Sequence, residues 1–139
     1  MPSILDHMSA LAAPVRCRML LLLEKQELTV SELCTVLQMP QSSVSRQLKT
    51  LADADWVASR RDGTSRFYSM SVDDLDPAAA RLWPVIREQV AGTAGTGQDE
   101  RRLRGVLTRR RARSQQFFAT AAHEWDDLRK ELFGDAFSL

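Results

Sequence analysis

Two groups of polar and basic residues have the types and the spacing needed to bind a phosphate backbone and the edges of bases. The first follows Pro40, in the first turn and on the outward face of an expected helix: Gln41, Ser42, Ser43, Ser45, Arg46 and Lys49. Arginine and lysine neutralise phosphate, and arginine, glutamine and serine also hydrogen-bond to bases. The second group crowds an expected hairpin: Arg60, Arg61 and Arg66. The two groups together indicate a surface for duplex DNA.

The apolar pattern on either side of Pro40 predicts the two helices that would present the first group. One stripe precedes the proline and another follows it at spacings of three and four: Leu33 and Leu37, then Val44, Leu48 and Leu51. Helices stop before a proline and readily start on one, so two short helices are expected with a tight turn between them. Ser31 is the expected N-cap of the first. This is the outline of a helix-turn-helix.

A β-hairpin is expected directly after these helices. Two β-prone runs, Val57–Arg61 and Ser65–Met70, are joined through Asp62-Gly63, a strong hairpin signal. The fold class is therefore mainly α with a small β-hairpin: a winged helix-turn-helix, followed by a long C-terminal helix. Two other interpretations of the same residues stay open, an ordinary solvated amphipathic helix and a winged helix that binds protein rather than DNA.

The remaining helices of the first 91 residues predict a core and an interface. The run Pro14–Lys25 is apolar on most sides and is expected at the centre of the core. The runs Ser3–Leu11 and Pro77–Ala91 are each apolar on one face, and we expect these faces to form a symmetric dimer interface. The alternative is that both helices only cap the core of one protomer. The interface residues are Ile4, Leu5, Met8, Leu11, Leu82, Val85, Ile86, Gln89 and Val90.

The composition shift after residue 91 divides the chain into three segments. Residues 1–91 are expected to form the DNA-binding and dimerisation domain, residues 92–98 a glycine-rich flexible linker, and residues 99–139 a helical extension. The arginine run 109–113 is either a solvated helix face or an auxiliary phosphate contact. The face carrying Phe117, Phe118 and Trp125 is too apolar to be left uncovered.

Composition limits the other possibilities. The chain has 139 residues, 44% hydrophobic residues and a net charge of +1, so only local clustering of its basic residues indicates nucleic acid. We expect the acidic residues, Glu27 among them, to lie away from the basic surface. No apolar run is long enough to cross a membrane and no signal peptide opens the chain, so a cytoplasmic protein is expected. Its two cysteines indicate a reducing compartment rather than a disulfide scaffold.

The chain resembles the arsenic-repressor (ArsR/SmtB) family of bacterial metal-responsive repressors over about half its length. The matching segments are Leu11–Arg16, Leu28–Leu33, Ser43–Leu51, Val57–Gly63 and Phe67–Met70. The resemblance implies a dimeric winged-helix repressor that leaves its double-stranded operator when a small-molecule inducer binds. Four residues depart from the family pattern and could alter operator choice: Val15, Gln47, Asp55 and Thr64.

The metal sites of the family do not transfer to this sequence. Where the family's thiolate site has three cysteines this chain has Thr29, Ser31 and Cys34, and one thiolate does not make a soft-metal site. The helix Pro77–Ala91 contains no histidine for the alternative site. No metal and no cofactor are expected. Cys17 and Cys34 could together sense oxidant or arsenite, or could simply be small buried apolar residues.

The C-terminal segment carries a second resemblance. Arg111–Phe118 and Glu124–Arg129 look like the leading helix of a class I S-adenosylmethionine methyltransferase, a domain that follows the repressor in one subgroup of the family. The alternative function is therefore an N-terminal regulatory fragment of such a fusion, whose catalytic domain is absent from this chain. The residues present form no catalytic constellation, so the chain itself is not expected to be an enzyme.

Overall fold

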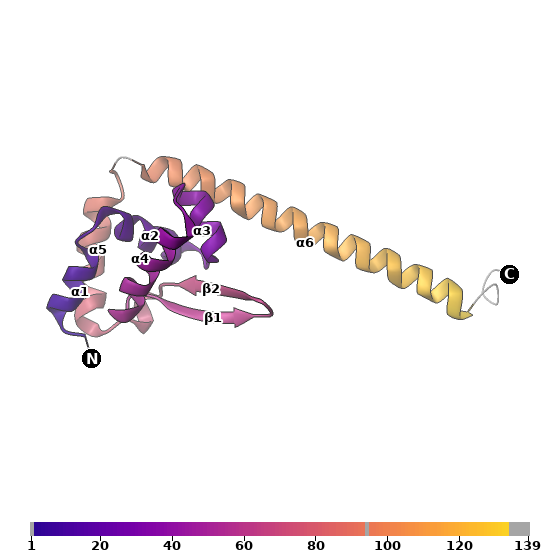
Figure 1. Cartoon of the computed structure of the whole chain (residues 1–139), viewed down its shortest axis with the longest axis horizontal. Coiled ribbons are helices and arrows are strands. Elements are labelled where there is room, and N and C mark those ends of the chain that lie inside the picture. The colour runs from indigo at the N-terminus through magenta and orange to yellow at the C-terminus, as the bar shows by residue number, and fades with distance from the viewer. Residues whose placement is uncertain (1, 94, 134–139) are drawn as a thin grey trace. The chain divides into compact units, whose positions relative to one another are not determined.

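The structure is a computed structural model that describes residues 2–93 and 95–133. In chain order the described residues form α1 (Ile4–Leu11), α2 (Pro14–Lys25), α3 (Val30–Leu37), α4 (Gln41–Asp53), β1 (Ala58–Asp62), β2 (Ser65–Ser69), the 3-10 turn η1 (Val72–Asp74), α5 (Pro77–Val90) and α6 (Thr96–Phe133). Figure 1 labels the α-helices and the two strands of the hairpin. The expected fold class, a winged helix-turn-helix with a long C-terminal helix, is confirmed. The chain divides into two compact units, Met1–Leu103 and Arg104–Leu139.

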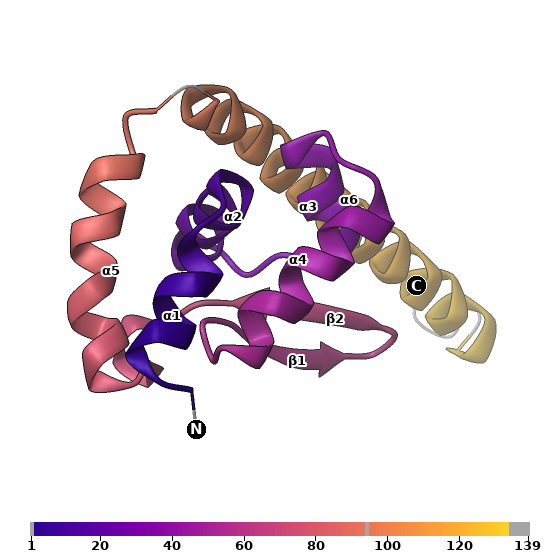
Figure 2. The same cartoon turned by 60° about the vertical axis from the view of Figure 1, so that its left-hand side comes forward.

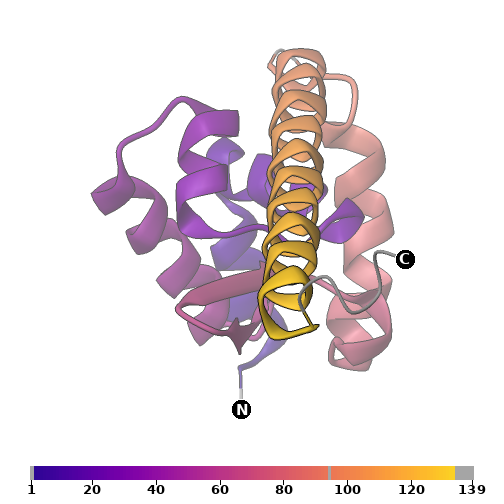
Figure 3. The same cartoon turned by 90° about the vertical axis from the view of Figure 1, so that its right-hand side faces the viewer.

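Helix α2 lies at the centre of the first unit, as its apolar sequence predicts. Met19, Leu20 and Leu23 are completely or almost completely buried, and α2 contacts α1, α4, α5 and β2. Figure 2 shows α2 between α5 on one side and the α3–α4 pair on the other, and Figure 3 shows the same separation from a second direction. The helix that carries the first basic group and the helix of the expected dimer face thus pack on a common core.

Two tryptophans complete this core. The indole of Trp56 donates a hydrogen bond to the backbone carbonyl of His7 at 3.0 Å, and its ring lies edge-on to that of Trp83, 6.2 Å between centroids. Trp83 lies off the apolar stripe expected on α5, and it is the face of Trp83 and Ala79 that is buried in the protomer. The predicted stripe of α5 lies on a different face from Trp83 and Ala79. Because only the face of Trp83 and Ala79 points into the core, the residues of the stripe are half-buried or exposed.

The turn between α3 and α4 lies where the sequence predicts it, but the N-cap of α3 differs from the expected one. Thr29, not Ser31, caps α3: its hydroxyl accepts from the amide of Glu32 at 3.2 Å, and the Glu32 carboxylate accepts from the Thr29 amide at 3.0 Å. This reciprocal capping box begins the helix at Val30, two residues earlier than a cap at Ser31 would. Helix α3 ends at Leu37, its C-cap residue Gln38 is left-handed with φ +57°, and Pro40 precedes α4 in extended conformation.

The hairpin differs from the predicted strands by one residue at the ends. In the antiparallel register Asp62 faces Ser65, and Gly63, with φ +64°, makes the tight turn that Asp62-Gly63 predicts. Leu28 and Tyr68 exchange backbone hydrogen bonds of 3.0 and 2.8 Å, so the base of the hairpin is fixed to the segment ahead of α3. The position of the wing relative to the helix-turn-helix is therefore set by backbone pairing.

Helix α6 starts inside the segment predicted as a linker. The Asp99 amide donates to the Gly95 carbonyl at 2.9 Å, and Asp99 itself is ion-paired to Arg18 of α2. Residues 96–98 of the predicted 92–98 linker are therefore helical, because the first turn of α6 is held against α2. Residues 134–139 of the predicted extension lie outside the described residues. Among the described residues, no helix is long and apolar enough to span a membrane.

Candidate nucleic-acid interface

The residues predicted on α4 divide cleanly between a buried and an exposed face. Val44, Leu48 and Leu51 are buried, as expected. The opposite face leaves five of the six predicted contact residues exposed, with Ser43 half-buried: Gln41, Ser42, Ser45, Arg46 and Lys49. Lys49 forms an ion pair of 3.2 Å with Asp53 one turn later, an exposed i,i+4 pair of small energy. The helix thus offers a polar and basic surface without losing core contacts.

The first turn of α4 offers backbone donors that the sequence analysis did not single out. Pro40 occupies the N-cap position, and no side chain caps the helix. The first amides that bond within the chain are those of Ser43 and Val44, both to the Pro40 carbonyl at 3.1 Å. The amides of Gln41 and Ser42 therefore point out of the helix start, where a phosphate is favoured by both the donors and the helix dipole. A proline in place of a capping serine is the sequence signal for this arrangement.

The strand register places two of the three wing arginines side by side. Arg61 lies directly opposite Arg66, and residues paired in this way share one face of a hairpin. The Arg66 guanidinium also donates to the Ser59 hydroxyl on that face, at 2.9 Å. Two guanidinium groups opposite one another repel unless an anion lies between them or close by. This face of the wing is therefore suited to a phosphate.

Arg60 faces the other way and is bound to the protein body. Its guanidinium makes a two-point ion pair with the carboxylate of Glu27 and lies over the ring of Phe67, 5.1 Å from the centroid. The hydrogen bonds to Glu27 are the main cause that raises the pKa of Arg60. The expectation that Glu27 lies away from the basic surface is wrong. The α2–α3 loop brings this carboxylate to the wing, and Arg60 anchors the hairpin there.

Gln47, one of the departures from the family pattern, is also engaged within the protein. Its side-chain carbonyl accepts a hydrogen bond of 2.9 Å from Arg16 of α2, and Arg16 also donates to the Ala10 carbonyl at 2.5 Å. A single arginine thus joins the end of α1 to the middle of α4. Gln47 therefore orients α4 and is not turned outward with Arg46.

The apolar faces expected at the dimer interface remain largely open on the protomer. Leu5 of α1 and Val85 of α5 are 71% and 58% exposed, and the two helices contact one another. Ile4, Met8 and Gln89 are also exposed, Leu82, Ile86 and Val90 are half-buried, and Leu11 is buried in the protomer core. Apart from Gln89 the open residues are apolar, and they lie on two helices that contact one another, so together they define an apolar surface across α1 and α5.

The two cysteines lie in different environments and form no disulfide. Cys17 is buried, its thiol donates to the Leu11 carbonyl at 3.2 Å, and burial raises the pKa of this thiol. Cys34 of α3 is half-buried. Among residues 2–93 and 95–133, no three histidine, cysteine or acidic side chains gather in a way that could hold a metal ion.

Comparison with known proteins finds a matching family and several relatives of this chain. Residues 13–59 match the family described as "Bacterial regulatory protein, arsR family". A transcriptional repressor SmtB homolog of Synechocystis is 38% identical over 66 residues, and the match spans 48% of this chain and 50% of that protein. The HTH-type transcriptional regulator Rv0081 of Mycobacterium tuberculosis is 36% identical over 87 residues, and the match spans 62% of this chain and 73% of Rv0081.

Solved structures agree with these sequence matches. The crystal structure of M. tuberculosis Rv0081 superposes with a TM-score of 0.51 at 36% identity, covering 62% of this chain and 83% of that one. The homodimeric winged helix-turn-helix DNA-binding domain of Mycobacterium bovis Mb0332 gives a TM-score of 0.54 at 25% identity, covering 66% and 81%. NolR from Sinorhizobium fredii gives 0.55 at 27% identity, covering 65% and 86%.

Proposed function

The chain belongs to the arsR family of bacterial regulatory proteins, and from this we propose that it is a homodimeric, sequence-specific DNA-binding repressor released from its operator by a small-molecule inducer. The observation that carries the proposal is the pairing of two surfaces on one compact unit. One is the polar face and uncapped start of α4, and the other is the cross-strand arginine pair Arg61 and Arg66. Because both are exposed and basic, they suit base edges in a groove and the adjacent backbone.

In this proposal the residues of α4 have different roles, which follow from the chemistry of their side chains. The first-turn side chains Gln41 and Ser42 reach base edges while the amides of the same turn hold a phosphate. Arg46 and Lys49 neutralise phosphate or, in the case of Arg46, contact guanine. Arg61 and Arg66 bind the backbone beside the groove, and Arg60 keeps the hairpin in position through Glu27.

A homodimer is the second part of the proposal. The apolar surface across α1 and α5 needs a partner, and a second copy of the same surface satisfies it with two-fold symmetry. The homodimeric state of the Mb0332 domain supports this arrangement. Light scattering after size exclusion tests it: Leu5→Lys is expected to yield monomers, whereas Leu5→Met should remain dimeric. A monomeric wild-type chain at micromolar concentration would contradict this part.

Operator binding is tested by fluorescence anisotropy on an inverted repeat from the region upstream of the gene. Wild-type affinity should fall steeply with salt, and Arg46→Ala should weaken binding by at least tenfold, since a contact to a charged group contributes about 1.5–3 kcal/mol. Arg101→Ala is the matched control, because Arg101 is exposed on the first turns of α6 and outside the proposed surface. Binding that is absent, or equal in Arg46→Ala and Arg101→Ala, would refute the DNA-binding role.

One observation favours the alternative of a repressor–methyltransferase fusion. In the second unit, α6 leaves Phe117 and Phe118 each 69% exposed, with Trp125 exposed two turns further on. This face requires a cover, and the resemblance of the same segment to the leading helix of a methyltransferase supports a catalytic domain as that cover. Sequencing the gene beyond the codon for Leu139 decides between the two. A reading frame that continues into a glycine-rich strand-turn-helix supports the fusion, and a stop codon removes it.

A further inference from the structure

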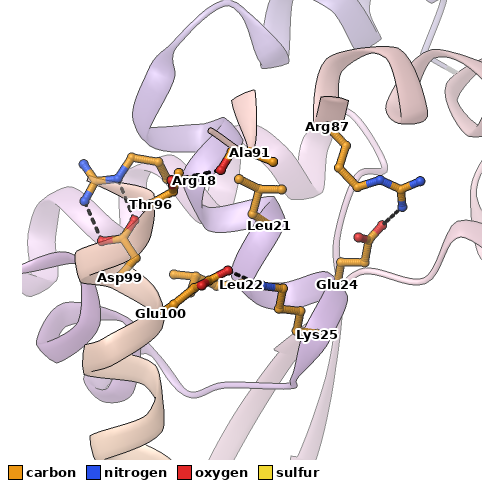
Figure 4. Close-up of a pocket in the computed structure, with 10 residues that line it drawn as sticks. All are labelled: Arg18, Leu21, Leu22, Glu24, Lys25, Arg87, Ala91, Thr96, Asp99 and Glu100. Atoms are coloured by element: carbon orange, nitrogen blue, oxygen red, sulfur yellow. Dashed lines mark hydrogen bonds and ion pairs between the residues drawn. The ribbon is translucent and has the colours of Figure 1, made fainter. Parts of the chain in front are cut away.

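A cavity of about 120 Å³ opens in the first unit between α2, α5 and the first turn of α6. Figure 4 shows Leu21 and Leu22 of α2 at its base, with Ala91 from the end of α5 above them. Charged side chains from all three helices surround this apolar base. The cavity lies away from α4 and the wing, and nothing in the proposed DNA interface uses it.

Three ion pairs form the rim, and each connects α2 to another helix. Arg18 pairs with Asp99 at 2.8 Å, Lys25 with Glu100 at 2.6 Å, and Glu24 with Arg87 at 3.0 Å. The Asp99 side chain is only 3% exposed and receives both Nε and Nη2 of Arg18. These hydrogen bonds are the main cause that raises the pKa of Arg18. A buried ion pair contributes little net stability because desolvation opposes it, so stability alone does not account for Asp99 at this place.

The rim has more capacity left for an anion than for a cation. The Asp99 carboxylate accepts hydrogen bonds from Nε and Nη2 of Arg18, so Nη1 of Arg18 is not used in this pair. The Glu24 carboxylate accepts from Nη1 of Arg87, so Nε and Nη2 of Arg87 are not used. The Glu24 carboxylate also accepts from the indole of Trp83. The Asp99 and Glu24 carboxylates thus each accept two hydrogen bonds, while Nη1 of Arg18 and Nε and Nη2 of Arg87 remain for a further acceptor. A guanidinium donor beside an apolar base is complementary to a carboxylate with an apolar body.

We propose that this cavity binds a small carboxylic acid with an apolar body of about four to six carbon atoms, a size set by comparison with the roughly 150 Å³ cavity that holds benzene. The apolar body lies on Leu21 and Leu22, and the carboxylate meets Arg87 at the rim. The binding of this acid in the cavity is independent of the proposed function. Its role as the inducer rests on the proposed repressor function.

The position of the cavity gives the ligand a route to the DNA-binding surface. Helix α2 belongs to the core on which α4 packs, and α5 carries half of the proposed dimer surface. A second carboxylate on Arg87 weakens the bond from Arg87 to Glu24, because the two carboxylates repel one another, and so loosens α5 from α2. A loosened α5 changes the orientation of the two protomers relative to one another, and this changes the distance between their α4 helices. A ligand that binds the altered dimer better than the DNA-bound one lowers operator affinity by the same factor.

Calorimetry on the whole chain tests the site with three compounds that share one carbon skeleton: isovalerate, isoamyl alcohol and isoamylamine. Isovalerate is expected to give saturable heat with a Kd in the millimolar range or tighter, as is reasonable for so few atoms. The alcohol and the amine should bind at least about tenfold more weakly, because they lack the charge-assisted bonds. Preference for the amine or the alcohol, or no saturable heat with isovalerate, would overturn the proposal.

Two variants test the residues assigned to the site. Leu21→Trp fills the cavity and should abolish binding of isovalerate, with Leu21→Phe as a second variant if tryptophan prevents folding. Arg87→Gln should weaken binding about tenfold, since it removes a charged donor. Arg81→Gln is the matched control on the same helix and outside the cavity, and it should bind as the wild type does. Wild-type binding by both cavity-filling variants would place the ligand elsewhere.

The inducer role is tested separately by operator anisotropy with and without isovalerate. The acid should lower the operator affinity of the wild type and leave that of Leu21→Trp unchanged, while both bind DNA equally without it. If isovalerate binds and operator affinity does not change, the inducer role is wrong. If the chain fails to bind DNA at all, the proposed function is wrong and the calorimetric result for the cavity still holds.

Discussion

Replacing Arg61 with glutamine tests the assignment of the wing most directly, because the register predicts two effects of opposite sign. In the free protein Arg61 lies opposite Arg66, and their repulsion is relieved when one charge is removed. A cross-strand pair contributes about 0.2–1 kcal/mol, and exposure to salt puts this one toward the lower end. The free energy of unfolding should therefore stay the same or rise by a few tenths of a kcal/mol, as measured by urea denaturation.

On DNA the same substitution removes one phosphate contact from each protomer. Each contact contributes about 0.9 to the slope of log K against log salt, so a dimer loses about 1.8. Between 50 and 200 mM salt, this reduces the salt-induced loss of affinity by roughly 12-fold relative to the wild type. Anisotropy titrations at four salt concentrations measure the slope.

Arg60→Gln is the comparison within the same hairpin. Arg60 is bound to Glu27 and lies over Phe67, so its replacement should loosen the wing and change the salt slope less than Arg61→Gln does. If Arg61→Gln leaves the slope unchanged while Arg60→Gln reduces it, the face of the wing assigned to DNA is the wrong one.

Four further outcomes follow from particular contacts. Leu48→Ala should lower the free energy of unfolding by about 2–5 kcal/mol in denaturant titrations, because a completely buried leucine leaves a cavity between α4 and the core. Thr29→Ala should lower it by about 1 kcal/mol through loss of the α3 capping box, whereas replacement by serine should restore most of that loss. Iodoacetamide should modify Cys34 well before Cys17, because burial raises the pKa of the Cys17 thiol and blocks access; equal rates by mass spectrometry would contradict its place in the core. Hydrogen bonds from the backbone and side chain of the N-cap residue Ser3 lower the pKa of Asp6 below 3.8. The stabilisation of α1 by this carboxylate is therefore present above the unfolded-state pKa and is lost as pH falls through the lower folded-state pKa. An NMR titration of the Asp6 carboxyl with a midpoint above 3.8 would be inconsistent with this cap.

The order and type of the elements could be predicted from the sequence because they depend on local patterns. Apolar spacing of three and four, Pro40 between two such stripes, and Asp62-Gly63 between two β-prone runs are each read from a few neighbouring residues. The buried and exposed faces of α4 follow from the same spacing, and so does the exposed position of Arg46. The sequence does not fix the N-cap of α3, because Thr29 and Ser31 are both good caps. Only the reciprocal bond with Glu32 decides between them.

Local sequence patterns therefore set the helices, the hairpin, and which side chains of α4 point outward, because the helical period fixes side-chain direction. Long-range packing sets which charges are engaged within the protein. Glu27 meets Arg60 across 33 residues, Gln47 meets Arg16 across 31, and Asp99 meets Arg18 across 81. No local pattern encodes such pairs, because they depend on how loops return separate helices to one place. For the same reason the sequence does not show that Arg60 is bound to Glu27 while Arg61 and Arg66 share the other face of the wing, nor that ion pairs surround a cavity beside α2.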